Sequence, residues 1–198
     1  MIEEQIRDRY KTILENADFN SDLLGFLEND FSPAFNTILS KSKKLWPGNF
    51  KNALTINHQL LSPSDFGFHN TLLVEERLKF IDFEYFGWDD PVKLTCDFML
   101  HPGMVLTDKQ KTLWLKMMRG IFSNDNTFPQ RLTASYGLYG LCWCLIILNV
   151  FKKNKQGEKS IKGLIKSDFE QKQTEQLGKS IKQLKHINEI HKHGLPYE

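Results

Sequence analysis

Apolar residues recur every three or four positions through the first 45 residues of the chain. This period is that of amphipathic helices, and it predicts helices over residues 2–16, 21–29 and 33–45. The third helix is expected to begin at Ser32-Pro33, with the serine as N-cap and the proline in the first turn. The N-terminal part of the chain is therefore predicted to be helical.

The helical period is lost between residues 54 and 91. Within this segment two short apolar runs, Thr71 to Val74 and Leu78 to Ile81, flank the polar turn Glu75-Glu76-Arg77. Apolar runs of this length around a polar turn predict a β-hairpin. We expect this segment to carry the functional site.

Helical patterns return after residue 91, with recognisable ends. Asp90-Pro91 is expected to begin a helix and His101-Pro102-Gly103 to end it. Thr107 with Gln110, and Ser167 with Glu170, have the spacing of capping boxes. The predicted helices lie over residues 92–100, 107–122, 128–152 and 167–190, and the basic segment 152–166 is predicted to be a loop.

Composition narrows the class of protein. The chain has 198 residues, 40% apolar and 25% charged, with a net charge of +2, which argues against nucleic acid as a partner. The apolar run 137–151 is shorter than the roughly 20 residues of a membrane span, so a buried core helix is expected and no membrane association. Three cysteines without metal-type spacing, and no secretory signal, predict a cytoplasmic location.

Three oxygen-bearing side chains in the hairpin segment suggest a chemistry. Asp65 is followed by Asn70 five positions later, and Asp82 follows the second apolar run. This order is that of a catalytic base and two metal ligands in kinase-type phosphotransferases. We expect Asp65 to accept the proton of an attacking hydroxyl, and Asn70 and Asp82 to hold Mg²⁺ on ATP, since hard oxygen donors suit that ion.

Asp65-Phe66-Gly67 also spells the magnesium-binding triplet of protein kinases. That assignment requires an upstream aspartate with an asparagine five residues later. Asp22 and Asp30 lack one, so Asp65 is interpreted as the base.

Each of these residues also has a simpler interpretation. Asp65 could be an ordinary turn residue, and Asn70 and Asp82 could cap turns or loops. His69 could contact phosphate, or orient the loop by hydrogen bonding. Glu84, Asp89 and Asp90 could bind a cationic substrate or a second magnesium ion, or form a solvated or capping loop. Trp88 could stack on a substrate or take part in aromatic packing.

The segment from Leu61 to Gly103 resembles the core of the aminoglycoside phosphotransferase and choline kinase family, which shares the protein-kinase-like fold. The matching positions are Asp65, Asn70, Asp82, Asp90-Pro91 and Asp97. The catalytic loop differs from the family pattern, because Pro63 stands where a histidine is usual and Ser64 where a glycine is usual.

The resemblance implies a mainly α (α+β) fold, the helical C-terminal lobe of a protein-kinase-like enzyme with one or two short β-hairpins at the site. It implies phosphoryl transfer from ATP to a hydroxyl of a small molecule such as an aminoglycoside, a choline-like alcohol or a sugar. The roughly 60 residues before Asp65 read as helices without a glycine-rich loop, so the N-terminal nucleotide-binding lobe is expected to be absent.

The isolated chain is therefore expected to be weakly active or inactive, with a nucleotide lobe in trans or a homo-oligomer as possible partners. The alternative function is a non-catalytic, pseudokinase-like binding or regulatory module. Metal-assisted phosphate hydrolysis is a weaker third possibility, because it needs more metal ligands than the segment offers.

Overall fold

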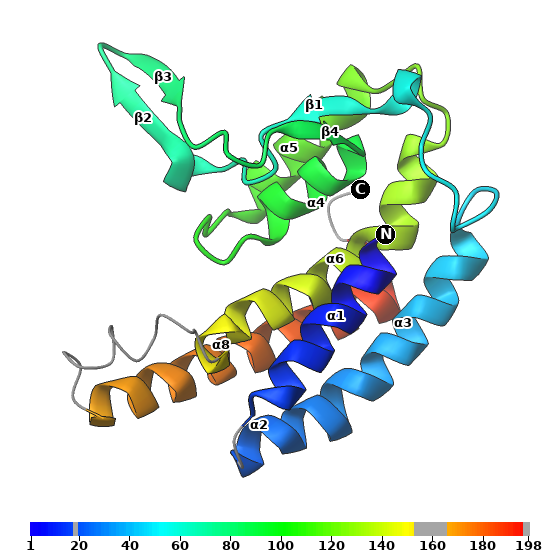
Figure 1. Ribbon diagram of the computed structural model, residues 1–198. Helices are drawn as coiled ribbons and strands as arrows, with labels where there is room; N and C mark the ends of the chain where they lie inside the picture. The colour runs from blue at the N-terminus through cyan, green and yellow to red at the C-terminus, as the bar shows by residue number, and fades with distance from the viewer. Residues whose placement is uncertain (18–19, 153–165, 196–198) are drawn as a thin grey trace.

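The computed structural model describes residues 1–17, 20–152 and 166–195. Helices dominate these residues, and the strands form two separate two-stranded antiparallel sheets. Figure 1 shows the helices stacked side by side, with the strands gathered at one end of the bundle. The predicted mainly α (α+β) class is confirmed.

Every predicted helical segment is helical in the structure, within the residues described. The α-helices are α1 (Ile2–Glu15), α2 (Ser21–Gly25), α3 (Ser32–Leu45), α4 (Pro91–Leu100), α5 (Asp108–Ile121), α6 (Phe128–Ile147) and α8 (Lys166–His193). Most of the predicted loop 152–166, and the side chain of Ser167 in its predicted capping box, lie outside the described residues.

The predicted break at Ser32-Pro33 is wrong, because the chain stays helical from Ser21 to Leu45. A π-helical turn, Phe26–Phe31, joins α2 to α3, and Ser32 N–H bonds Leu27 O five residues earlier. A π turn shifts the hydrogen-bond register by one residue, so the missing N–H of Pro33 is accommodated without ending the helix. Ser32 is therefore inside a helix and is not an N-cap.

Helix α6 is the centre of the bundle and packs against α1, α3, α4 and α8 (Figure 1). By length and composition alone the segment Phe128–Phe151 could cross a membrane, but 67% of its most apolar window is buried inside the protein. That burial is the one expected of a core helix.

Close packing of α6 on α8 depends on Gly140. A Cβ atom at Gly140 would overlap the side chain of Ile187, which is fully buried, whereas a Cβ at Gly178 of α8 would meet no atom within 4 Å. We expect Gly140→Ala to lower the free energy of unfolding by about 1–3 kcal/mol through overpacking. Gly178→Ala, the matched control, should raise it by up to about 1 kcal/mol, because alanine favours helix. Urea denaturation of both variants measures the two signs, and equal effects would contradict the packing argument.

The strands form two nested ribbons. Strand β1 (Leu60–Ser62) pairs antiparallel with β4 (Gly87–Asp89), and β2 (Thr71–Val74) pairs antiparallel with β3 (Arg77–Phe80). The β2–β3 hairpin is the predicted one, and it projects from the helical body (Figure 1).

The second strand of the hairpin begins at Arg77, one residue earlier than predicted. The turn has two residues rather than three, because Glu75 and Glu76 both adopt positive φ, 49° and 60°. Two consecutive left-handed residues make a tight turn that matches strand twist, and Arg77 then pairs with Val74.

Candidate active site

The nested ribbons bring two loops together. The loop 63–70 runs from β1 to β2, and the loop 81–86 runs from β3 to β4. Because β1 pairs with β4 and β2 with β3, both loops cross between the ribbons at the same place. Ile81 N–H donates to Asn70 O at 3.0 Å and ties them directly. Asp65 and Asn70 on one loop thus lie at the same junction as Asp82 on the other.

The carboxylate of Asp65 is held by two neighbours on its own loop. Asn70 Nδ2 donates to Asp65 O at 2.9 Å and to Asp65 Oδ2 at 3.3 Å, and His69 Nε2 lies 3.0 Å from Asp65 Oδ1. The side-chain bonds of Asn70 use its amide nitrogen, so its amide oxygen is left for a cation. Two roles were considered for His69, a contact to phosphate and the orientation of the loop by hydrogen bonding. Its contact with Asp65 is of the second kind.

Backbone contacts shape this loop. Ser64 has a left-handed φ of 64°, and Asp65 N–H donates to Pro63 O at 2.8 Å. At Gly67 a Cβ atom would overlap the His69 ring and lie 2.9 Å from Met104 Sδ, so only glycine fits. Phe66 anchors the loop by packing its ring against Phe80, Phe98 and Trp114.

His101, which directly follows α4, supports the loop 63–70 by contacting His69. The His101 ring stacks on the His69 ring with centroids 4.1 Å apart and an interplanar angle of 9°. Gly103 N–H donates to His101 Nδ1 at 3.0 Å, and Trp143 meets the His101 ring edge-on. Burial, and then the neighbouring His69, lower the pKa of His101, so its neutral form is favoured in the stack.

Asp65, His69 and His101 could be considered as a metal group, because one ligand atom of each lies within 4.8 Å of the others. Their geometry does not favour one. The two imidazole rings are nearly parallel, so a metal ion in the plane of one ring would lie outside the plane of the other. The stack is better explained as the support of Asp65 through His69.

Asp82 lies on the second loop with a left-handed φ of 62° and an exposed side chain. Its carboxylate has no hydrogen bond or ion pair with any residue in the described part of the chain. The pKa of the Tyr85 phenol is raised by a hydrogen bond to Glu84 and then by the charges of Glu84, Asp82 and Asp65. Carboxylates from both loops therefore act on the Tyr85 phenol, so negative charge is concentrated around it.

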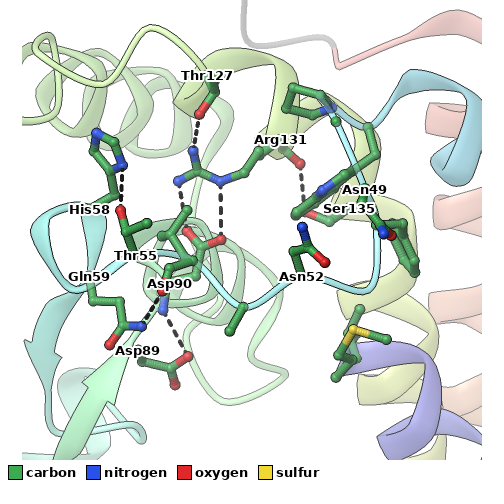
Figure 2. A pocket seen from close by; sticks show the side chains of 18 of the residues that line it. Asn49, Asn52, Thr55, His58, Gln59, Asp89, Asp90, Thr127, Arg131 and Ser135 are labelled. Atoms are coloured by element: carbon green, nitrogen blue, oxygen red, sulfur yellow. Dashed lines mark hydrogen bonds and ion pairs between the residues drawn. The ribbon is translucent and has the colours of Figure 1, made fainter.

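The remaining substrate candidates lie elsewhere, apart from Glu84 on the second loop. Trp88, Asp89 and Asp90 line a cavity of about 510 Å³ at the other end of β4. Figure 2 shows this cavity between the loop 46–59, the end of β4 and the first half of α6.

Asp90 and Asp89 have partners of their own. Asp90 caps α4, since Val92 N–H donates to its Oδ1 at 2.8 Å. The Asp90 carboxylate also accepts hydrogen bonds from Arg131 Nε and Nη2 at 3.2 and 3.1 Å. Asp89 pairs with Lys93 at 3.2 Å. Lys93 also pairs at 3.1 Å with Asp97, which accepts a hydrogen bond from Trp143. The bond from Val92 N–H gives Asp90 the capping role that was one of its alternative interpretations.

Arg131 was not among the predicted residues, yet it joins three elements. Its side chain is only 2% exposed and bonds Asp90, Thr127 and Asp125, whose Oδ2 lies 2.9 Å from Nη1. A signal was available, because Arg131 is the only charged residue in the sequence of α6. A lone charge on a core helix indicates a buried partner.

This network makes stability depend on pH. Burial raises the pKa of Asp125, but hydrogen bonds from Thr127 and Arg131 outweigh it and hold the pKa below the usual 3.8. A carboxyl group with a lowered folded-state pKa stabilises the fold above its unfolded pKa, and this contribution is lost as the pH falls through the folded pKa. We expect Asp125→Asn to lose less stability than the parent protein between about pH 5 and about pH 2.

Urea denaturation at the two pH values measures the effect. Asp8→Asn, which changes an exposed carboxylate on α1, is the control and should keep the parent pH dependence. Parallel pH profiles of Asp125→Asn and the parent would contradict the assignment.

Comparisons of this chain with protein-family models, with curated proteins and with solved structures give no match.

Proposed function

We propose that this chain is the catalytic and substrate-binding lobe of an ATP-dependent small-molecule phosphotransferase. The observation that carries the proposal is the junction of the two loops, where the Ile81–Asn70 backbone bond ties the loop of Asp65 and Asn70 to the loop of Asp82. The acceptor is a hydroxyl group of a small molecule such as an aminoglycoside, a choline-like alcohol or a sugar. The cytoplasmic location belongs to the same proposal.

The residues divide the chemistry between them. The acceptor oxygen forms a bond to the γ-phosphorus, the bond from that phosphorus to the ADP oxygen breaks, and Asp65 accepts the hydroxyl proton. His69 and Asn70 hold the Asp65 carboxylate in place. The amide oxygen of Asn70 and the carboxylate of Asp82 are hard donors that fit Mg²⁺, which when bound neutralises phosphate charge.

The β2–β3 hairpin offers a surface for a nucleotide-binding lobe. Leu73 pairs with Leu78, and Phe80 lies on the same face two residues along the strand; all three are between 45% and 71% exposed. A two-stranded hairpin is marginally stable alone, and exposed apolar faces mark interaction sites. We propose that this face is covered by a nucleotide lobe in trans, or by a second copy of the chain, and that the isolated chain has weak activity.

Magnesium-dependent binding of ATP tests the proposal. We expect ATP to bind with Mg²⁺ and not with EDTA, and Asp82→Ala to weaken that binding at least about tenfold, since it removes one of two protein ligands. Isothermal titration calorimetry measures both. Asp22→Ala, an exposed aspartate on α2, is the matched control and should bind as the parent does.

Binding of ATP without metal dependence, unchanged in Asp82→Ala, would contradict the proposal. A further comparison adds a nucleotide-binding lobe in trans and measures ATP turnover. Turnover should rise, because ATP bound by one lobe alone has misaligned phosphates. Robust turnover by the chain alone would refute the need for a nucleotide-binding lobe.

One observation favours the alternative, a non-catalytic binding module. The 510 Å³ cavity is not lined by Asp65, Asn70 or Asp82, so a ligand could bind there without any phosphoryl transfer. Unchanged binding of such a ligand in variants of the two loops would support the module.

A further inference from the structure

The cavity and the two loops lie at opposite ends of the β1–β4 ribbon. In that ribbon Ser62 pairs with Gly87 at the end next to the loops, and Leu60 pairs with Asp89 at the other end. The cavity is formed beyond that second end, by Trp88 to Asp90, the loop 46–59 and one face of α6 (Figure 2). A strand extends about 3.3 Å per residue. The length of the β1–β4 ribbon and the turn at Ser64 therefore separate the cavity from Asp65.

The walls of the cavity are those of a small-molecule site. Its volume of about 510 Å³ is within the range of ligand pockets, which are mostly apolar with a few polar groups. Four aromatic side chains contribute to the lining, namely Trp46, Phe50, Trp88 and Tyr139. Trp88 is 59% exposed, so its ring is available for stacking.

The charges at the cavity disfavour an anion. Arg131 already bonds the carboxylates of Asp90 and Asp125, and Lys93, behind the wall, lies between those of Asp89 and Asp97. The ammonium group of Met1 is paired with Glu4 at 2.7 Å. Each of these cations is therefore neutralised by carboxylates, and Arg131 and Lys93 are each outnumbered two to one.

The negative charge of these carboxylates acts on Tyr139, which lines the cavity. Burial, and then the charges of Asp90, Asp97 and Asp89 among others, raise the pKa of Tyr139 well above its ordinary value. A negative potential beside aromatic faces is the environment that attracts a cation. Asn49, Asn52 and Gln59 also line the cavity, with Gln59 beside Asp89 and the two asparagines away from it (Figure 2), and they offer neutral polar contacts.

We infer that this cavity is a second ligand site, separate from the two loops, that binds an organic cation with an apolar body. Its aromatic walls would hold the cation by stacking, and Asp89, which lines the cavity, would supply a carboxylate. The inference does not depend on phosphoryl transfer, because the ligand contacts none of Asp65, Asn70 or Asp82.

Benzyltrimethylammonium is a suitable probe, because it has no hydroxyl group and so cannot be a phosphoryl acceptor. We expect it to bind the parent protein at least about tenfold more tightly than benzyl alcohol, its uncharged counterpart, and benzoate not to bind. Tryptophan fluorescence and isothermal titration calorimetry at constant ionic strength report the affinities.

Two cavity variants and two matched loop variants locate the site. Asp89→Asn and Trp88→Leu should each weaken binding of the cation about five- to tenfold. Asp82→Asn and Phe83→Leu remove a carboxylate and an aromatic ring on the loop 81–86, and should bind within about twofold of the parent. Trp88 and Phe83 are both exposed, so neither leucine variant threatens the core.

Several outcomes would overturn the inference. Failure of the cation to bind, or equal binding of benzyl alcohol, would remove the charge argument. An equal loss in Asp82→Asn and Asp89→Asn would place the ligand at the loops instead of the cavity. Loss of ATP binding in Asp82→Ala has no bearing on these outcomes, so failure of this inference and failure of the proposed function are distinguished.

Discussion

Replacing Arg131 by methionine is expected to lower the free energy of unfolding by about 3–5 kcal/mol. The reason is the surroundings of the guanidinium group, which is 2% exposed and bonds Asp125, itself 7% exposed, and Asp90. Removal of the guanidinium group leaves two carboxylates in a poorly solvated place without the cation that compensates their charge. Because domains are stable by only about 5–15 kcal/mol, a large part of the stability of this protein should be lost.

Urea denaturation followed by circular dichroism measures this loss. Arg77→Met is the matched control, because Arg77 lies on the exposed β3 strand and surface changes usually alter stability by less than about 0.5 kcal/mol. Arg131→Lys should fall between the two, since lysine keeps the charge but not the planar fork. A loss in Arg131→Met no larger than in the control would show that the network contributes little.

Replacing Asp65 by asparagine is expected to reduce phosphoryl transfer on the order of 10²- to 10⁴-fold, the usual contribution of a general base. Asparagine keeps the size of the side chain and an oxygen for the bond from Asn70, which lies 3.3 Å from Asp65 Oδ2. It loses the ability to accept the hydroxyl proton. The measurement is transfer of the γ-phosphoryl group of ATP to a panel of small alcohols, with a nucleotide-binding lobe supplied.

Affinity for ATP with Mg²⁺ separates the base from the metal ligands. Asp65→Asn should bind ATP within a few-fold of the parent, whereas Asp82→Ala should not. Asp22→Asn on α2 should affect neither quantity. Equal transfer rates for Asp65→Asn and the parent would show that Asp65 is not the base.

The parts of the fold that follow local rules could be predicted from the sequence. Asp90-Pro91 begins α4, and Thr107 with Gln110 forms a capping box, because both depend on neighbours within one turn. Strands β1 and β4 were missed because each has three residues and is defined by its partner across the ribbon. The helix break at Ser32 was wrong because a π turn leaves no periodic signal.

The candidate site shows the same division. Asp65, Asn70 and Asp82 could be proposed from spacing, since the hairpin between them fixes how the two loops meet. His101 stacks under His69 from 32 residues along the chain, and Arg131 reaches Asp90 from 41 residues away. Such contacts depend on how α4 and α6 pack, which a local pattern does not contain.

The tip of the β2–β3 hairpin has a consequence for how the two loops are held. Glu75 and Glu76 adopt left-handed conformations, each costing on the order of 1 kcal/mol for a residue with a Cβ atom, and strand β3 is exposed throughout. This ribbon should therefore open far more often than the helical bundle does. A ligand that bridged the two loops at the base of this ribbon would suppress that opening, so binding and local folding would be thermodynamically linked.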